Sequence, residues 1–308
     1  MSKLILDCDP GVDDAIALLL AFASPELELL GVTTVAGNVG AELTARNARL
    51  IRQIAGREDV PVHAGAVRPL VRPPVEADHF HGESGLGDLD IFEPRAPAAA
   101  GHAAAFIVEA LRREPPGSVT VAVTGPMTNL ALALALEPGL AGRIGQVVAM
   151  GGARSEGGNI TASAEYNIFA DPHAAQAVIG CGAPVVMFGL DVTHQVRATE
   201  ARLATLRASA RPAARAASVL FDFANRTERE LVGGTAAPLH DPCPIAWLIA
   251  PELFELRPCD LQVETASPLT LGHTAVEFRL ADPAAAKVRW AVRADADGVF
   301  ALLTERLA

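Results

Sequence analysis

Four carboxylates fall within eight residues near the start of the chain: Asp7, Asp9, Asp13 and Asp14. Negative charges this close together repel one another strongly unless a cation neutralises them or some of them take up protons. Carboxylate oxygens suit a hard ion such as Ca²⁺ or Mg²⁺ far better than zinc or copper. The segment therefore predicts a cation site, with a solvated acidic helix start as the plain structural alternative.

The residues around these acids predict how they are positioned. Residues 4–8 form a short apolar run that indicates a buried strand. Alternation along this strand places Asp7 and Asp9 on one face, near the carboxyl end. The next two acids of the cluster open an apolar helix over residues 15–23. The junction between a strand end and a helix start is where open α/β sheets bind their ligands.

The rest of the chain repeats this order of strand and helix. Further strands are predicted over residues 27–35, 60–64, 119–123, 146–150 and 185–191, and helices over residues 42–55, 102–113, 126–136, 171–179, 198–231 (interrupted near residue 211) and 241–250. Strands over residues 261–263, 274–279 and 288–292 then precede a last helix over residues 298–307. This order predicts one α/β domain over residues 1–308, with an open, mostly parallel Rossmann-like sheet, helices on both faces and an antiparallel C-terminal edge.

One long stretch, residues 67–101, has no periodicity and is rich in proline, glycine and acids. A loop of this length in a compact enzyme is commonly a lid or a binding element. It carries the glycine-punctuated segment 79–87 (HFHGESGLG), which includes His81. We expect this segment to be able to move and to close over the site.

Composition excludes several classes of partner. Half of the residues are hydrophobic, as in globular proteins, and the net charge of −11 argues against nucleic acid or an anionic membrane surface. The four cysteines are scattered and form no CxxC pair, which fits a reducing compartment. With no signal peptide pattern and no apolar run of about 18 residues, the sequence predicts a cytoplasmic protein.

Several residues that could contact a ligand end predicted strands: Asp7, Asp9, Asn38, Thr124, Met150 and Asp191. Strand ends of a parallel sheet meet at one edge, so these residues should line one crevice. His240 is followed directly by Asp241 at another loop-to-helix junction. Taken by itself, a His-Asp pair at such a junction is a common helix cap. Beside the aspartate cluster, it could supply one more oxygen ligand and an acid with a pKa near neutrality.

Over essentially its whole length, the chain resembles the nucleoside hydrolases of the inosine–uridine-preferring type. The strongest match is the segment 7–15 (DCDPGVDDA), which is highly specific for that family. Supporting matches are AGNV at 36–39, TGPMTN at 124–129, MGG at 150–152, Asn159 with EYN at 165–167, and LHD at 239–241. Their order and spacing leave little room for coincidence.

The resemblance implies roles residue by residue. The implied Ca²⁺ ligands are Asp9, Asp14, Asp241 and the carbonyl of Thr124. The implied ribose contacts are Asp13 and Asn38 at the 2′- and 3′-hydroxyls, Asn159, Glu165 and Asn167 on the 5′ side, and Met150 beside the sugar. Asp9 would also take the proton of the attacking water, and Asp7 would position its neighbours. The implied activity is Ca²⁺-dependent hydrolysis of ribonucleosides to ribose and a free purine or pyrimidine base, a salvage reaction, in a homodimer or homotetramer.

The chain departs from the familiar pattern near the leaving base. Familiar members carry tyrosines in the helix before the LHD motif, but residues 221–231 contain none, and Tyr166 is the only tyrosine of the chain. His240 and His81 are then the candidates to serve the leaving base, with a helix cap and an exposed loop histidine as the simpler alternatives. Base preference stays open, with a slight lean towards pyrimidines because histidine contacts suit small polar rings.

The sequence leaves two alternative functions. A phosphatase of the haloacid-dehalogenase type also has an Asp-x-Asp pair after an apolar strand, but needs a lysine near the phosphoryl group. Lys3 and Lys287 are the only lysines, and neither stands in a suitable pattern. The second alternative is a non-catalytic nucleoside- or ribose-binding protein on the same fold. Release of free ribose from inosine or uridine separates the hydrolase from both.

Overall fold

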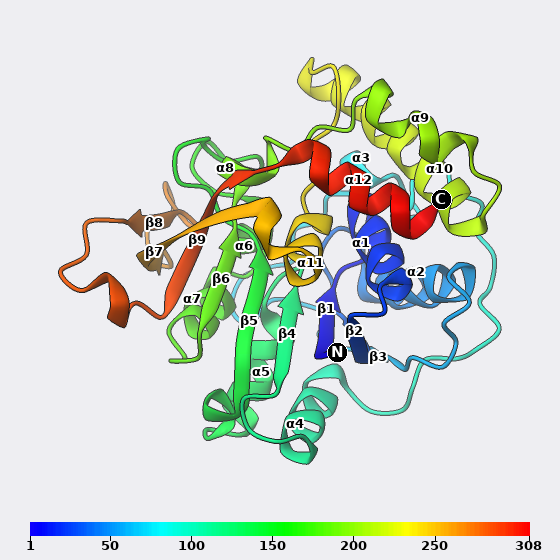
Figure 1. The fold of residues 1–308 in the computed structure, drawn as a ribbon. Coiled ribbons are helices and arrows are strands. Elements are labelled where there is room, and N and C mark those ends of the chain that lie inside the picture. The colour runs from blue at the N-terminus through cyan, green and yellow to red at the C-terminus, as the bar shows by residue number, and fades with distance from the viewer.

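The computed structural model describes residues 1–308, with the exception of the side chain of Asp78. Nine strands of the described chain form one sheet in the order β3-β2-β1-β4-β5-β6-β9-β7-β8 (Figure 1). The strands are β1 Ser2–Cys8, β2 Leu27–Thr34, β3 Val62–Ala64, β4 Val119–Val123, β5 Ile144–Met150, β6 Val185–Phe188, β7 Phe254–Val263, β8 Thr274–Glu277 and β9 Val288–Ala294. Pairing is parallel from β3 to β9, and β7 and β8 form the antiparallel edge. The predicted α/β fold class is therefore confirmed.

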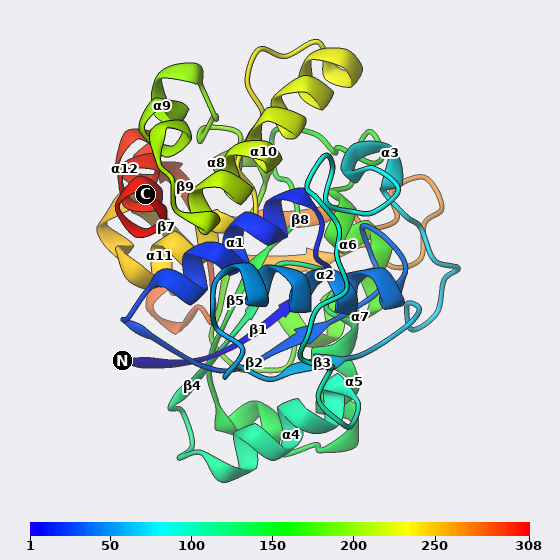
Figure 2. The same ribbon diagram turned by 90° about the vertical axis from the view of Figure 1, so that its right-hand side faces the viewer.

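Helices cover both faces of the sheet (Figures 1 and 2). They are α1 Val12–Ala23, α2 Ala41–Ile54, α3 Asp78–His81, α4 Ala103–Arg113, α5 Thr128–Leu136, α6 Tyr166–Ala170, α7 Pro172–Ile179, α8 Leu190–Thr193, α9 Glu200–Ala208, α10 Pro212–Thr227, α11 Pro242–Ile249 and α12 Ala296–Leu307. Short turns of 3-10 helix are η1 Leu140–Arg143, η3 Pro251–Leu253 and η4 Pro283–Ala285, and η2 Glu228–Val232 is a π-helix. Across the described part of the chain, no helix combines the length and the apolar character needed to cross a membrane.

Successive side chains of β1 point alternately into two apolar cores. Leu4, Leu6 and Cys8 of β1 pack into the core shared with α1, α2, α10, α11 and α12. Ile5 of the same strand packs into the opposite core, with α4, α5 and α7. Asp7 follows the parity of Ile5 and contacts Asn129 of α5, as period-two alternation requires.

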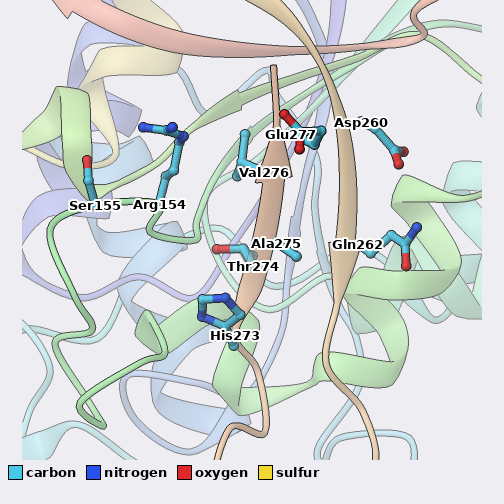
Figure 3. A pocket seen from close by; sticks show the side chains of 9 residues that line it. All are labelled: Arg154, Ser155, Asp260, Gln262, His273, Thr274, Ala275, Val276 and Glu277. Atoms are coloured by element: carbon cyan, nitrogen blue, oxygen red, sulfur yellow. The ribbon is translucent and has the colours of Figure 1, made fainter. Parts of the chain in front are cut away.

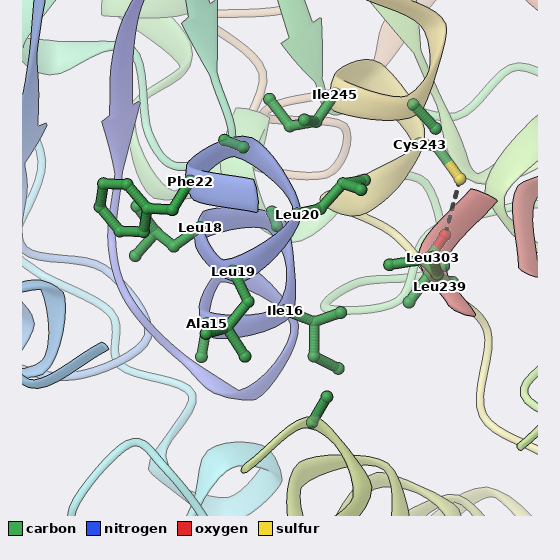
Figure 4. Packing of buried hydrophobic residues seen from close by; sticks show 14 of the residues in the cluster. Ala15, Ile16, Leu18, Leu19, Leu20, Phe22, Leu239, Cys243, Ile245 and Leu303 are labelled. Carbon is green, nitrogen blue, oxygen red and sulfur yellow. Dashed lines mark hydrogen bonds between the residues drawn. The ribbon is translucent and has the colours of Figure 1, made fainter. Parts of the chain in front are cut away.

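Helix α1 is the centre of the larger core. Every residue from Asp14 to Phe22 is buried, because the sheet lies on one side and α2, α10, α11 and α12 surround the others. Figure 4 shows side chains of α11 and α12, among them Ile245 and Leu303, gathered around the helix. This packing fixes the start of α1, where Asp13 and Asp14 lie.

Several predicted boundaries were wrong by two or more residues. Helix α5 begins at Thr128, so Pro126 precedes it instead of opening it. Strand β6 ends at Phe188, and Asp191 lies in α8, because Gly189 turns against the indole of Trp290, where a Cβ atom would lie 2.2 Å from Cζ2. Strand β7 begins at Phe254, well before residue 261, because Pro258 lies in the part of β7 that pairs with β9 alone and has no strand on its other side.

We expect Leu19→Ala to lower the free energy of unfolding by about 3 kcal/mol, because a fully buried leucine leaves a cavity in a core that is packed on all sides. Urea unfolding followed by circular dichroism measures the change. Leu136→Ala is the matched control, since Leu136 is 66% exposed and its loss should change the value by no more than about 0.5 kcal/mol. Equal losses in the two variants would contradict this account of the core.

Candidate active site

A cavity of about 430 Å³ lies at the carboxyl edge of the parallel strands. Asn38 and Thr124, which follow β2 and β4, line this cavity, and so does Met150, the last residue of β5. The predicted site residues in its wall are Asp13, Asn38, His81, Thr124, Met150, Asn159, Glu165, Asn167, His240 and Asp241. The crevice predicted from the strand ends is therefore present, and Asp9 and Asp14 lie buried beneath its surface. Asp7 and Asp191 were also expected to line it, but neither belongs to its wall, because Asp7 is buried under the sheet edge and Asp191 lies in α8.

Three carboxylates meet at the floor of this cavity. Asp13, Asp14 and Asp241 each offer an oxygen, and these oxygens lie within 4.8 Å of one another. Packing of α1 against α11 brings Asp241 from the far end of the chain to the start of α1. Asp13, expected from the resemblance at the ribose, thus lies close enough to the other two to share a cation with them.

The side chain of Asp14 is fixed by donors from three segments. Its Oδ2 accepts hydrogen bonds from the Gly11 backbone N–H at 3.1 Å and from Nδ2 of Asn38 at 2.9 Å. Its Oδ1 accepts one from the Thr124 hydroxyl at 2.9 Å. Strand ends β1, β2 and β4 therefore converge on this one carboxylate.

Asp9 sits in a slot between two glycines. Its Oδ2 accepts a hydrogen bond from the Asn38 backbone N–H at 2.8 Å. A Cβ atom at Gly37 would lie 2.0 Å from Oδ2, and one at Gly125 would lie 2.4 Å from Oδ1. Among the described residues, Oδ1 of Asp9 is buried without any hydrogen-bond partner. A buried, unpartnered carboxylate oxygen is costly, so this atom calls for a ligand that the chain does not supply.

The raised pKa values of the buried acids also indicate a cation site. Burial, with the negative charge of Asp14, raises the pKa of Asp9 well above its usual range. Burial and the charge of Asp13 raise the pKa of Asp14 to about 7, and the same two causes raise the pKa of Asp241 strongly. A divalent cation among these groups would reverse that balance and favour their ionised forms. The all-oxygen donor set and the unpartnered Oδ1 of Asp9 therefore fit a hard cation.

Asp7, which precedes the cluster on β1, is held by two side-chain hydrogen bonds. Its Oδ1 accepts hydrogen bonds from the Thr33 hydroxyl at 2.7 Å and from Nδ2 of Asn129 at 2.8 Å. Asn129 also donates to the Thr34 carbonyl and accepts from the Ala66 N–H. Asp7 thus ties β1 to β2 and α5.

The residues expected on the ribose 5′ side form a second polar group. Glu165 caps α6, accepting from the Asn167 N–H at 2.9 Å and the Ile168 N–H at 3.2 Å, and it also accepts from the Gly152 N–H at 2.9 Å. Nδ2 of Asn167 donates to the Thr124 carbonyl at 2.8 Å. Asn159 accepts from the Tyr166 N–H at 2.9 Å. Each of these side chains therefore also holds a local turn or a strand end in place.

The two histidines of the cavity wall come from segments far apart in the sequence. His81, in α3, accepts a hydrogen bond at Nδ1 from the Val12 N–H at 3.0 Å, so its neutral ring carries the proton on Nε2. Nδ1 of His240 lies 2.8 Å from the Thr193 hydroxyl. Burial lowers the pKa of His81 and lowers that of His240 to about 4, against the weaker raising effect of Asp13. The expectation that His240 has a pKa near neutrality was wrong.

Sequence reasoning missed part of the cavity wall. Arg197 and Glu228 both line it and form an ion pair, with Nη1 to Oε1 at 2.9 Å. His194 lines the same wall, and its ring centroid lies 5.8 Å from that of His240. Charged residues usually face solvent, so no sequence signal separated this pair from the other arginines and glutamates.

A second cavity, of about 530 Å³, lies on the outer ribbon of β7 and β8 (Figure 3). Its polar side chains include Arg154, His273 and Glu277, which Figure 3 shows around strand β8. It contains no predicted site residue. We therefore assign the chemistry to the smaller, acidic cavity.

The fold and the site define an α/β protein whose acidic, oxygen-lined cavity at the carboxyl edge of the sheet suits a cation and a hydroxyl-rich ligand. The chain belongs to the inosine-uridine preferring nucleoside hydrolase family, whose model matches residues 4–301. The predicted resemblance is thereby confirmed, and the protein is an enzyme that acts on ribonucleosides.

Several similar proteins have names that agree with this family. A pyrimidine-specific ribonucleoside hydrolase RihA of Shewanella sp. (strain ANA-3) is 45% identical over 308 residues, covering 99% of this chain and 96% of that protein. A purine-preferring ribonucleoside hydrolase from Gardnerella vaginalis has a TM-score of 0.92 at 33% identity, covering 99% of this chain and 98% of that one. A plant nucleoside hydrolase gives a TM-score of 0.92 at 32% identity, with the same coverage.

We expect Asp14→Ala to abolish cation binding, because Asp14 is the carboxylate on which three strand ends converge. After dialysis against CaCl₂, elemental analysis should find about one Ca²⁺ per chain in the unmodified protein and far less in the variant. Asp260→Asn, which alters an exposed acid outside the cavity, is the control and should retain the metal. Unchanged metal content in Asp14→Ala would place the cation elsewhere.

Proposed function

We propose that the protein hydrolyses the N-glycosidic bond of ribonucleosides with Ca²⁺ held by Asp9, Asp14, Asp241 and the Thr124 carbonyl, giving ribose and a free base. The observation that carries this proposal is the meeting of the Asp13, Asp14 and Asp241 carboxylates, whose oxygens lie within 4.8 Å of one another, together with the unpartnered Oδ1 of Asp9. Asp13 is the least buried of the three clustered acids and lines the cavity, which supports a role at the ribose hydroxyls.

The cation and Asp9 would divide the activation of water between them. When bound, Ca²⁺ orients the attacking water and lowers its pKa, but as a weak Lewis acid it leaves the proton to be removed by a base. Asp9 can serve as that base because Asn38 holds Oδ2 and leaves Oδ1 without a partner. The sugar hydroxyls would complete the roughly 6–8 oxygens that calcium takes.

The remaining groups act on the sugar. Cleavage builds positive, oxocarbenium-like charge on the ribose, and a cavity rich in carboxylates stabilises this charge as it develops. Asp13 and Asn38 would hold the 2′- and 3′-hydroxyls, while Glu165, Asn167 and Asn159 hold the 5′ side. Met150, buried at the end of β5, would pack beside the sugar.

The leaving base needs a proton or a hydrogen-bond donor. Because burial lowers the pKa of both His81 and His240, each ring is neutral near pH 7. We propose that His81 donates from Nε2–H, the nitrogen left free by the Val12 contact, and that His240, which lines the same cavity, assists it. Tyr166 does not replace the missing tyrosines, since its hydroxyl donates to the Val75 carbonyl.

We propose pyrimidine ribonucleosides as the preferred substrates. The pyrimidine-specific name of the 45% identical Shewanella protein supports this preference. The fold alone does not decide it, because a purine-preferring hydrolase has the same fold at a TM-score of 0.92. We also keep three predictions from the sequence: one domain over residues 1–308, a homodimer or homotetramer, and a cytoplasmic location.

The wild-type protein should release ribose from uridine and reject 2′-deoxyuridine by about 10³-fold or more in kcat/KM, because the missing hydroxyl leaves buried polar groups unpaired. A reducing-sugar assay on a panel of nucleosides measures both. Asp9→Asn serves as the control that the activity belongs to this site, with kcat falling at least ~10²-fold. Comparable rates for uridine and 2′-deoxyuridine would contradict the assignment of the ribose contacts.

His81→Ala and His240→Ala should each slow uridine far more than p-nitrophenyl riboside. The nitrophenolate leaves as a stable anion and needs no proton, so it bypasses the step that we assign to the histidines. Steady-state kcat on the two substrates gives the comparison, and a general acid contributes ~10²- to 10⁴-fold. Equal losses on both substrates would mean that the histidines shape the cavity without serving the leaving base.

A further inference from the structure

One buried side chain of α2 joins the two segments that carry the proposed catalytic groups. Nδ2 of Asn47 donates to the Pro10 carbonyl at 3.0 Å and to the Ser84 carbonyl at 2.9 Å. Pro10 lies between Asp9 and α1, and Ser84 lies three residues after His81. Asn47 is fully buried, and both hydrogens of its amide are used.

The neighbouring arginine fixes the orientation of this amide. Oδ1 of Asn47 accepts from Nη2 of Arg46 at 2.8 Å and from Nε at 3.2 Å. The same Nη2 donates to the Ser84 carbonyl at 3.1 Å. Since the guanidinium has donors alone, it must face the carbonyl oxygen of the amide, and Nδ2 must face Pro10 and Ser84.

The glycine-punctuated segment is shaped around Asn47. At Gly85, whose φ is +81°, a Cβ atom would lie 2.8 Å from Nδ2 of Asn47. Leu86 is fully buried in the larger core, and the Gly87 N–H donates to the His81 carbonyl at 2.9 Å. The segment that the sequence predicts to move is therefore held at Ser84 and at Leu86.

We infer that Asn47 is a positioning residue for departure of the base and that it acts through His81. His81 reaches the aspartate segment through one hydrogen bond, from the Val12 N–H to Nδ1, and that bond sets which nitrogen can donate to the base. Asn47 holds both segments that this bond connects. It does not itself line the cavity among the described residues. The inference rests on the proposed role of His81.

Asn47→Ala and Asn47→Asp test the inference, with kcat on uridine compared with kcat on p-nitrophenyl riboside in saturating Ca²⁺. The alanine removes the donor, and the aspartate places a carboxylate against two carbonyls. Misplacement of a catalytic group by about an ångström can slow a reaction about 10²-fold. We therefore expect the uridine rate to fall by about that factor, while p-nitrophenyl riboside, which bypasses His81, changes little.

Two further variants separate positioning from general damage to α2. Thr44→Ala is the matched control, because Thr44 is buried on the same helix and its hydroxyl bonds only its own helix, at Ala41, among the described contacts. At a comparable loss in melting temperature, it should leave unchanged the ratio of kcat on uridine to kcat on p-nitrophenyl riboside. Arg46→Ala removes a weaker donor to Ser84, and should lower the ratio slightly even if the Asn47 variants do not fold.

The variant His81→Ala makes the outcomes distinguishable. If it lowers the ratio and the double variant with Asn47→Ala lowers it no further, the two residues act in one step and the inference stands. If His81→Ala lowers the ratio while the Asn47 and Arg46 variants do not, or if the losses multiply, the inference is wrong and the proposed function survives. If His81→Ala leaves the ratio unchanged, the proposed role of His81 fails and the inference falls with it.

Discussion

Burial of like charges at one edge of the sheet is the constraint on which the rest of the structure depends. Asp9, Asp14 and Asp241 are at most 3% exposed, although together they carry three potential negative charges. An uncompensated buried charge has an effective penalty of several kcal/mol. Backbone N–H groups, the Asn38 amide and the Thr124 hydroxyl offset part of this penalty, and a bound cation would offset the rest. The donors that surround the cluster are therefore held tightly by the fold.

The apolar core and the polar site both depend on the position of helix α1. Helix α1 begins with the acids of the cluster and continues as a helix buried on every side. Its packing against α11 is what delivers Asp241 to Asp14. A shift of α1 along its axis would break both the core and the carboxylate cluster, so a substitution deep in the core, far from any ligand, can alter the geometry of the site.

Much of the fold and the position of the site could be predicted from hydrophobic period and strand ends. Strand β4 has the predicted bounds, and Asn38, Thr124 and Met150, which were expected at the crevice, line one cavity. What could not be predicted depends on contacts between distant segments. The turn that ends β6 is set by Trp290, the approach of Asp13 to Asp241 depends on helix packing, and the Arg197–Glu228 pair follows no sequence pattern. The anchors of the loop that carries His81 could not be predicted either, because they are a hydrogen bond from Asn47 of α2 and the burial of Leu86 in the larger core.

The glycine slot around Asp9 has a consequence for protein engineering. A library that randomises the floor of this cavity must leave positions 37 and 125 as glycine, since even an alanine methyl group would displace the carboxylate. Gly56, Gly101 and Gly117 differ in kind, because a Cβ atom there meets nothing within 4 Å and the positive φ is the sole restriction. Those three positions tolerate asparagine better than other residues, so diversity intended to tune stability belongs on the surface turns and not beside the acids.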